Sequence, residues 1–131
     1  MTEQTTQDGS VISIILPTRG RTNGALQDSI ASLLDNADDC ARIEIMLGVD
    51  EDDADTIDWV NTKAADFVKA YGCACKAKVF KPLGYTKLNV YVNLLCHAST
   101  GQWLFLWNDD ALMQTKGWDT EVRSYDGQFK C

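Results

Sequence analysis

The sequence predicts an α/β fold, a parallel sheet with helices on both faces. Two observations favour it. Strand-like apolar runs and amphipathic helical stretches alternate three and a half times along the chain. The buried runs are also too apolar to leave either face of a sheet exposed, which is typical of parallel strands. The four runs cover residues 11–16, 42–49, 75–80 and 103–107.

The first run, VISIIL at 11–16, is rich in β-branched residues and is too short for a buried helix. Pro17 follows it, so we expect the strand to end there. Thr22 can cap a helix that continues to about Asn36, because apolar residues recur at spacings of three and four. These residues are Leu26, Ile30, Leu33 and Leu34.

The second run, RIEIMLGV at 42–49, is the second predicted strand. A helix follows it, with apolar residues at helical spacing from Ile57 to Tyr71. Its acidic first turn suits the helix dipole, and Gly72 ends it. The third run, CKAKVF at 75–80, is expected near an edge of the sheet because lysines alternate through it.

A third helix is predicted from Leu88 to Ser99, with Gly101 at its end and the apolar run WLFLW as the fourth strand. Right-handed crossovers and the commonest doubly wound topology predict the strand order 3-2-1-4 of a Rossmann-like sheet. Ligands of such sheets bind at the carboxyl edge, near the point where the strand order reverses. That edge is where we expect the functional site.

Length and composition limit the classes of partner and the compartment that this chain can have. The chain has 131 residues, a net charge of −7 and five cysteines. This length predicts a single domain over 1–131 with a flexible N-terminus at 1–10. The negative charge disfavours nucleic acid and anionic membranes as partners. An odd number of irregularly spaced cysteines, with no membrane-length apolar run and no signal-peptide pattern, predicts free thiols in a cytoplasmic protein.

Three loops are expected to meet at the carboxyl edge: PTRGR at 17–21, DEDDAD at 50–55 and NDD at 108–110. They combine Arg19 and Arg21 with seven carboxylates, which would repel an anionic ligand. A divalent cation would reverse the local sign and allow a phosphate to bind. Oxygen ligands favour Mg²⁺ or Mn²⁺. The carboxylates are Asp50, Glu51, Asp52, Asp53, Asp55, Asp109 and Asp110.

Helix capping and exposure in a solvated turn are simpler roles for some of these carboxylates. Asp53 and Asp55 lie where a helix begins, and we favour a capping role for both. Asp109 and Asp110, judged alone, fit a solvated turn after a strand as well as they fit a site. Their combination with the other two loops favours a site.

Four segments in this order resemble the nucleotide-sugar half of family 2 glycosyltransferases of the GT-A fold. They are SIILPTRGR, GVDEDDADT, a G…N…A…G helix and WLFLWNDDA, and the resemblance spans about residues 11–125. NDDALMQTKGWD is also similar to phage-encoded members. About twenty residues follow the acidic motif, so the resemblance implies a truncated GT-A domain.

The resemblance assigns residues by position. Thr18 and Arg21 match the loop under the nucleotide, Asp50 the contact to the base, and Asp110 the metal ligand. Asn108 replaces the first acid of the Asp-x-Asp-type motif and adds no charge. The full set implied for the nucleotide sugar is Pro17, Thr18, Arg19, Arg21, Asp50, Asp52, Lys87, Asn93, Asn108 and Asp109. Asp109 and Asp110 are the implied ligands of Mn²⁺ or Mg²⁺.

The family pattern Ala-Arg-Asn appears here as YVN, which keeps Asn93 but loses the arginine, whose charge Lys87 could replace. The implied activity is metal-dependent transfer of a hexose, most simply from a UDP-sugar, to an acceptor hydroxyl of unknown identity. Asp119, Glu121 and Asp126 are candidate bases, and spacing selects none. A non-catalytic or truncated nucleotide-sugar-binding domain and an α/β interaction domain remain open, as does a homodimer.

Overall fold

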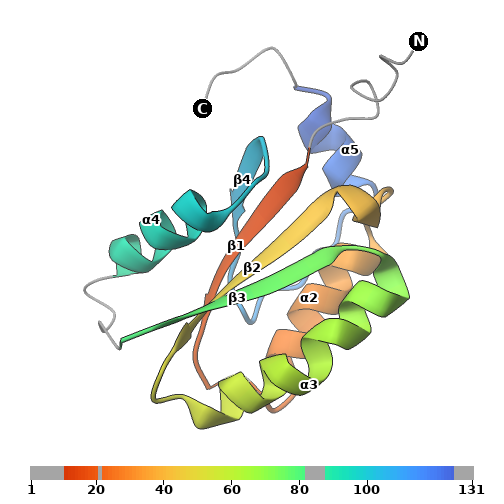
Figure 1. Ribbon diagram of the computed structural model, residues 1–131. Coiled ribbons are helices and arrows are strands. Elements are labelled where there is room, and N and C mark those ends of the chain that lie inside the picture. Colours follow the sequence, from red (N-terminus) through yellow and green to blue (C-terminus); the bar gives the residue numbers. More distant parts are fainter. Residues whose placement is uncertain (1–10, 21, 82–87, 126–131) are drawn as a thin grey trace.

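The computed structural model describes residues 11–20, 22–81 and 88–125. Its centre is a four-stranded sheet in the order β3-β2-β1-β4, with every neighbouring pair parallel (Figure 1). The predicted Rossmann-like topology is therefore confirmed. The strands are β1 Ile12–Thr18, β2 Ile43–Asp50, β3 Ala74–Phe80 and β4 Trp103–Leu106.

Three helices occupy the predicted crossovers. They are α2 Ala25–Asp35, α3 Ala54–Tyr71 and α4 Leu88–Ala98, and Gly72 ends α3 in the left-handed conformation, with φ 77°. Two short elements were not predicted: the 3₁₀ turn η1 Cys40–Arg42 and the helix α5 Trp118–Arg123. No helix in the described part of the chain has both the length and the apolar character needed to cross a membrane.

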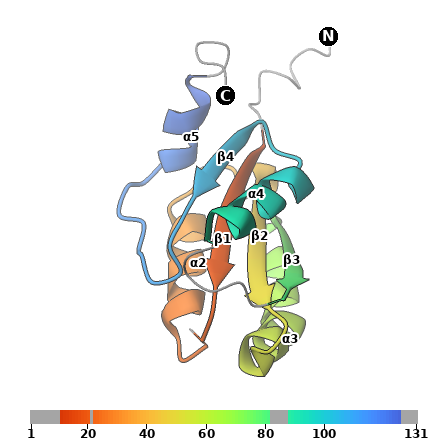
Figure 2. The same ribbon diagram turned by 90° about the vertical axis from the view of Figure 1, so that its left-hand side faces the viewer.

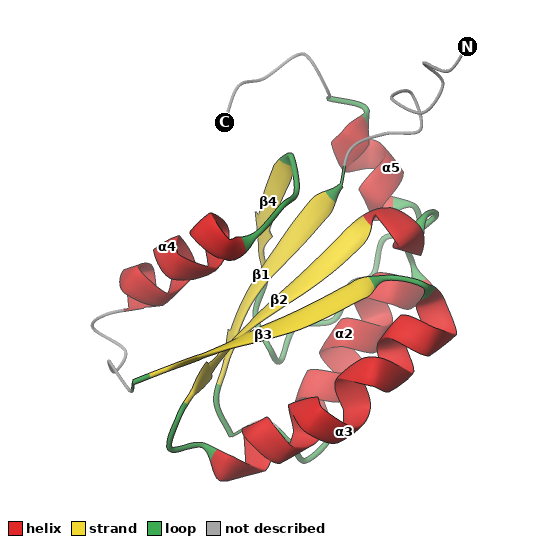
Figure 3. Ribbon diagram, viewed as in Figure 1, coloured by secondary structure: helices red, strands yellow, loops and turns green. Residues whose placement is uncertain are grey.

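The helices divide the sheet into two unequal faces (Figure 3). α2 and α3 cover one face, where the larger core lies and where Ile14 and Ile45 are fully buried. α4 lies over the other face, and its Leu95 packs on Ile15 and Met46. Successive side chains of a strand point to opposite faces, so a continuous apolar run supplies both cores.

The structure corrects two expectations for the start of the chain. β1 passes through Pro17 and ends at Thr18. Proline is tolerated here because β4 pairs with β1 only as far as Ile15, so no partner on that side needs the missing N–H. Thr22 does not cap α2; that position belongs to Gly24, whose φ of 121° favours glycine, with no side-chain cap.

The two edge strands differ from the buried pair between them. β3 is an edge strand, as the alternating lysines predicted. β4 forms the other edge, as the predicted order requires, but only one of its faces is covered, although its apolar run predicted two covered faces. Trp103 and Phe105 pack on the larger core, whereas Leu104 and Leu106 are 46% and 58% exposed.

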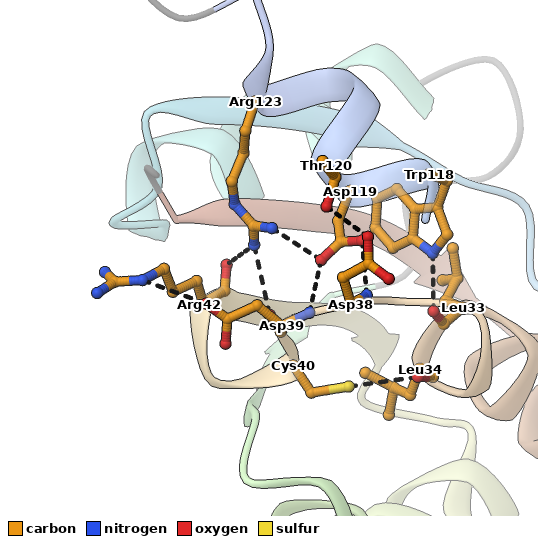
Figure 4. Close-up of polar contacts among 10 residues, drawn as sticks. All are labelled: Leu33, Leu34, Asp38, Asp39, Cys40, Arg42, Trp118, Asp119, Thr120 and Arg123. Atoms are coloured by element: carbon orange, nitrogen blue, oxygen red, sulfur yellow. Dashed lines mark hydrogen bonds and ion pairs between the residues drawn. The ribbon is translucent and has the colours of Figure 1, made fainter. Parts of the chain in front are cut away.

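Two networks of polar side chains lie near the amino ends of the strands. In the first, the fully buried Asp119 of α5 accepts hydrogen bonds from the amides of Asp38 (2.8 Å) and Asp39 (2.9 Å) and pairs with Arg123 at 2.7 Å (Figure 4). Trp118 adds a bond from its indole Nε1 to the Leu33 carbonyl, at 2.8 Å. Together they fasten α5 to α2 and to the connection between α2 and β2.

The second network surrounds Glu44 on the α4 face of the sheet. This carboxylate is 2% exposed and accepts hydrogen bonds from Ser13 (2.7 Å), Lys76 (2.9 Å) and the Thr100 amide (2.9 Å). Gly101 follows Thr100 in the sequence. A Cβ added at Gly101 would lie 2.5 Å from the Ser13 hydroxyl, so only glycine fits there. The network therefore joins β1, β2 and β3 to the turn before β4.

The four cysteines in the described part of the chain are free thiols: Cys40, Cys73, Cys75 and Cys96. Burial raises the pKa of Cys40 to about 11 and that of Cys75 to about 12. Both are therefore protonated at neutral pH and act as small apolar groups.

Candidate functional site

The carboxyl ends of β1, β2 and β4 meet at one edge of the sheet, opposite the edge that carries α5 (Figure 2). Hydrogen bonds join the ends of these strands and the loops that follow them. Thr18 donates from its hydroxyl to Asp109 at 2.8 Å, and Arg19 donates to Asp50 at 2.6 Å. The β1 loop is thus the centre of the cluster, as the order 3-2-1-4 requires.

Arg19 lies between two carboxylates of the β2 loop. Its Nη1 is 2.6 Å from Asp50 and 2.6 Å from Asp52, and its side chain is 49% exposed. Hydrogen bonds to Asp52 and then Asp50 raise the pKa of the guanidinium, and the bond from Arg19 lowers the pKa of Asp52. Part of the negative charge of this edge is thereby neutralised by the protein itself.

Asp53 performs the structural role expected of it. It is the N-cap of α3, where its side chain accepts from the amide of Thr56, and it also accepts from the amide of Gly20 at 2.9 Å. Burial raises the pKa of Asp53, but the bonds from Thr56 and Gly20 outweigh burial and lower it. Asp55 lies in the first turn of α3 and is exposed.

The loop after β4 presents Asn108, Asp109 and Asp110. Asp109 is half-buried and is oriented by the buried Thr18, whereas Asn108 and Asp110 are exposed. Ala111 donates its amide to the Asn108 carbonyl at 3.2 Å, which closes a tight turn. Two adjacent carboxylates therefore lie on a short loop with a defined backbone.

The oxygen ligands at this edge fit a hard divalent cation. Asp109 and Asp110 are consecutive on one loop, and the hydroxyl of Thr18 contacts the carboxylate of Asp109. Residues 11–20, 22–81 and 88–125 contain no group of three or more His, Cys, Asp or Glu arranged to hold a metal. Mg²⁺ is commonly bound through only one or two carboxylates together with substrate phosphates, so the residues present match that mode.

The other predicted site residues are distributed unevenly. Pro17 lies half-buried at the carboxyl end of β1. Asn93 is exposed in the middle of α4, on the far side of the sheet from α2 and α3 (Figure 3). Arg21 and Lys87 lie outside the described residues, so their assignments stay predictions.

The candidate bases are also separated by the fold. Asp119 is buried and paired at the amino edge of the sheet, so it cannot act at the carboxyl edge. Glu121 is exposed on α5, at that same remote end (Figure 2). Asp126 lies outside the described residues.

A group of polar side chains on α2 and its C-cap that contacts the chain after β4 escaped prediction. The buried Ser29 donates to the Asn108 carbonyl at 3.0 Å, and Trp107 donates its indole N–H to the Ser29 hydroxyl at 2.9 Å. Further along α2, Ser32 and Asn36 contact the chain at Met113. The spacing 29, 32, 36 marks one helix face, and this polar stripe beside the apolar one was the available signal.

A scan against protein-family models and a search of curated proteins find no match for this chain.

Proposed function

We propose that this chain binds a nucleotide diphosphate sugar, most simply a UDP-sugar, at the carboxyl edge of its sheet through Mn²⁺ or Mg²⁺, and transfers the sugar to an acceptor hydroxyl. The observation that carries the proposal is the junction of the three loops. Thr18 bonds to Asp109 and Arg19 bonds to Asp50 and Asp52, so groups suited to phosphate, base and metal lie side by side.

Each group has a chemical role in this proposal. Asp109 and Asp110 would hold the ion, with Asp109 oriented by Thr18. When bound, the ion would stabilise the negative charge of the departing diphosphate. Asp50 would accept a hydrogen bond from the base, and Asn108 can donate to and accept from sugar hydroxyls. Arg19 supplies a permanent positive charge beside the phosphates.

Calorimetry tests the binding half of the proposal. UDP- and GDP-sugars are titrated into the wild type, Asp110→Ala and Asp55→Ala, with and without Mn²⁺. We expect binding that requires Mn²⁺, is lost in Asp110→Ala and is retained in Asp55→Ala, because Asp55 is an exposed acid of the same edge at the start of α3. Equal binding without the ion would contradict the role of Asp110.

The catalytic half needs a separate measurement. Release of nucleoside diphosphate in the presence of an acceptor mixture would support transfer. Ion-dependent binding without release would favour a non-catalytic nucleotide-sugar-binding domain. Absence of both would favour an α/β interaction domain whose acidic loops are only a solvated surface.

A further inference from the structure

The chain that follows β4 runs along α2 from the carboxyl edge of the sheet to its amino edge, where α5 begins (Figure 2). Polar side chains of α2 hold it at successive points. Ser29 contacts Asn108, Ser32 accepts from the Met113 amide at 2.8 Å, and Asn36 donates to the Met113 carbonyl at 3.0 Å. We call residues 107–117 the strap.

Ser29 differs from the other residues that hold the strap. Its side chain is fully buried, and its hydroxyl forms two long-range hydrogen bonds, donating to the Asn108 carbonyl and accepting from the Trp107 indole. A serine inside a helix commonly returns its hydroxyl proton to the helix backbone, as Ser32 does to the Ser29 carbonyl at 2.7 Å. The Ser29 hydroxyl is directed instead at the backbone of the acidic loop.

The acidic loop is consequently held from two sides. Ser29 fixes the carbonyl of Asn108, and Thr18 fixes the carboxylate of Asp109, the next residue. These anchors come from α2 and β1, both parts of the larger core. Groups that orient metal ligands through hydrogen bonds contribute to affinity although they do not touch the ion.

We propose that Ser29 is a positioning residue of the carboxyl-edge site: it fixes the backbone of the loop 108–110, so that Asp109 and Asp110 present their oxygens together to a divalent cation. The inference rests on the proposed function, because it assigns the loop to ion binding. It adds a residue on α2 that lies outside the three loops predicted to form the site.

The test compares Ser29→Ala with Ser32→Ala, its matched control. Both remove a hydroxyl from the same helix and the same strap, but Ser32 contacts the strap at Met113, beyond the acidic residues. Mn²⁺ is titrated into each protein with and without a UDP-sugar, because two carboxylates commonly hold such an ion together with substrate phosphates. We expect affinity to fall about tenfold or more in Ser29→Ala, by analogy with other groups that orient ligands, and to stay near the wild-type value in Ser32→Ala.

Two further readouts separate positioning from stability. In nitrogen-15 spectra of the ion-free protein, Ser29→Ala should shift the Trp107 indole signal and speed hydrogen exchange at the Ala111 amide, which closes the loop turn. Urea unfolding should show that both variants are folded under the titration conditions, although Ser29→Ala should lose more stability because the Trp107 indole N–H loses its acceptor. If Ser29→Ala does not fold, the nearly isosteric Ser29→Cys, a weaker donor, should still bind Mn²⁺ less tightly than Ser32→Ala.

The outcomes distinguish this proposal from the one on which it rests. If wild type binds Mn²⁺ and Ser29→Ala or Ser29→Cys binds it equally well, the role of Ser29 is overturned and the metal site stands. If wild type binds no Mn²⁺, with or without a nucleotide sugar, both proposals fail. A loss of affinity in Ser32→Ala as large as that in Ser29→Ala would also contradict a specific role for Ser29.

Discussion

The amino edge and the carboxyl edge of the sheet, which lie at the two ends of its strands, use carboxylates in opposite ways. At the amino edge, Asp119 and Glu44 are 0% and 2% exposed, and backbone amides and cationic side chains surround each of them. At the carboxyl edge, the side chain of Asp52 is 52% exposed, and Asp110 is exposed as well. Acid content alone therefore does not identify the functional edge.

The difference lies in what satisfies each charge. A buried carboxylate must be compensated within the protein, so its partners are part of the fold. An exposed carboxylate remains hydrated and can exchange water for a ligand at small cost. The comparison assigns structural roles to Asp119 and Glu44 and leaves the exposed acids of the carboxyl edge accessible to a ligand. Three measurements can break or sharpen it.

The largest effect is expected for Asp119→Ala. The substitution leaves Arg123, whose side chain is 8% exposed, without its carboxylate and removes the acceptor of the Asp38 and Asp39 amides. Breaking a buried pair in this way costs about 3–5 kcal/mol. Urea unfolding should show that loss. Asp119→Asn, which keeps an acceptor oxygen, should lose less, and a loss no larger than that of a surface variant would refute the structural role.

A smaller effect, dependent on pH, is expected for Glu44. Burial raises the pKa of Glu44, but hydrogen bonds from the Thr100 amide, Ser13 and Lys76 outweigh burial and lower it below the ordinary value of 4.5. Below that pH the unfolded chain takes up a proton that the folded protein still excludes. The stabilising contribution of ionised Glu44 is therefore complete above about pH 5 and is lost as the pH falls.

Glu44→Gln measures this contribution. At pH 7 the variant should lose about 1–3 kcal/mol, because Ser13 and the Thr100 amide lose a charged acceptor. Between pH 5 and 3 its free energy of unfolding should fall less steeply than that of the wild type. Parallel curves for the two proteins would show that Glu44 does not contribute to acid sensitivity.

The smallest effect is expected for Asp52→Ala at the carboxyl edge. Asp52 is exposed, and Arg19 keeps its bond to Asp50 after the substitution. Exposed ion pairs contribute little to stability, so the urea midpoint should match the wild type within error. A marked loss would show that the carboxyl edge is as structural as the amino edge, and the comparison would fail.

Local sequence patterns determined much of the fold of this protein. Apolar runs and helical spacing predicted the four strands, the three crossover helices and the order 3-2-1-4, because parallel crossovers leave few topologies open. That order in turn brought the loops at Thr18, Asp50 and Asp109 together. The exposed face of β4 was missed because an apolar run does not tell which of its faces finds a partner.

Only the tertiary structure decided which acids are structural and what holds the acidic loop. Asp109 and Asp119 are only ten residues apart in sequence, yet they lie at opposite edges of the sheet. The partners that distinguish them are far away in sequence: 81 residues separate Asp119 from Asp38, and 91 separate Asp109 from Thr18. Residue spacing reports the period of a helix or strand, whereas such contacts exist only once the elements have packed.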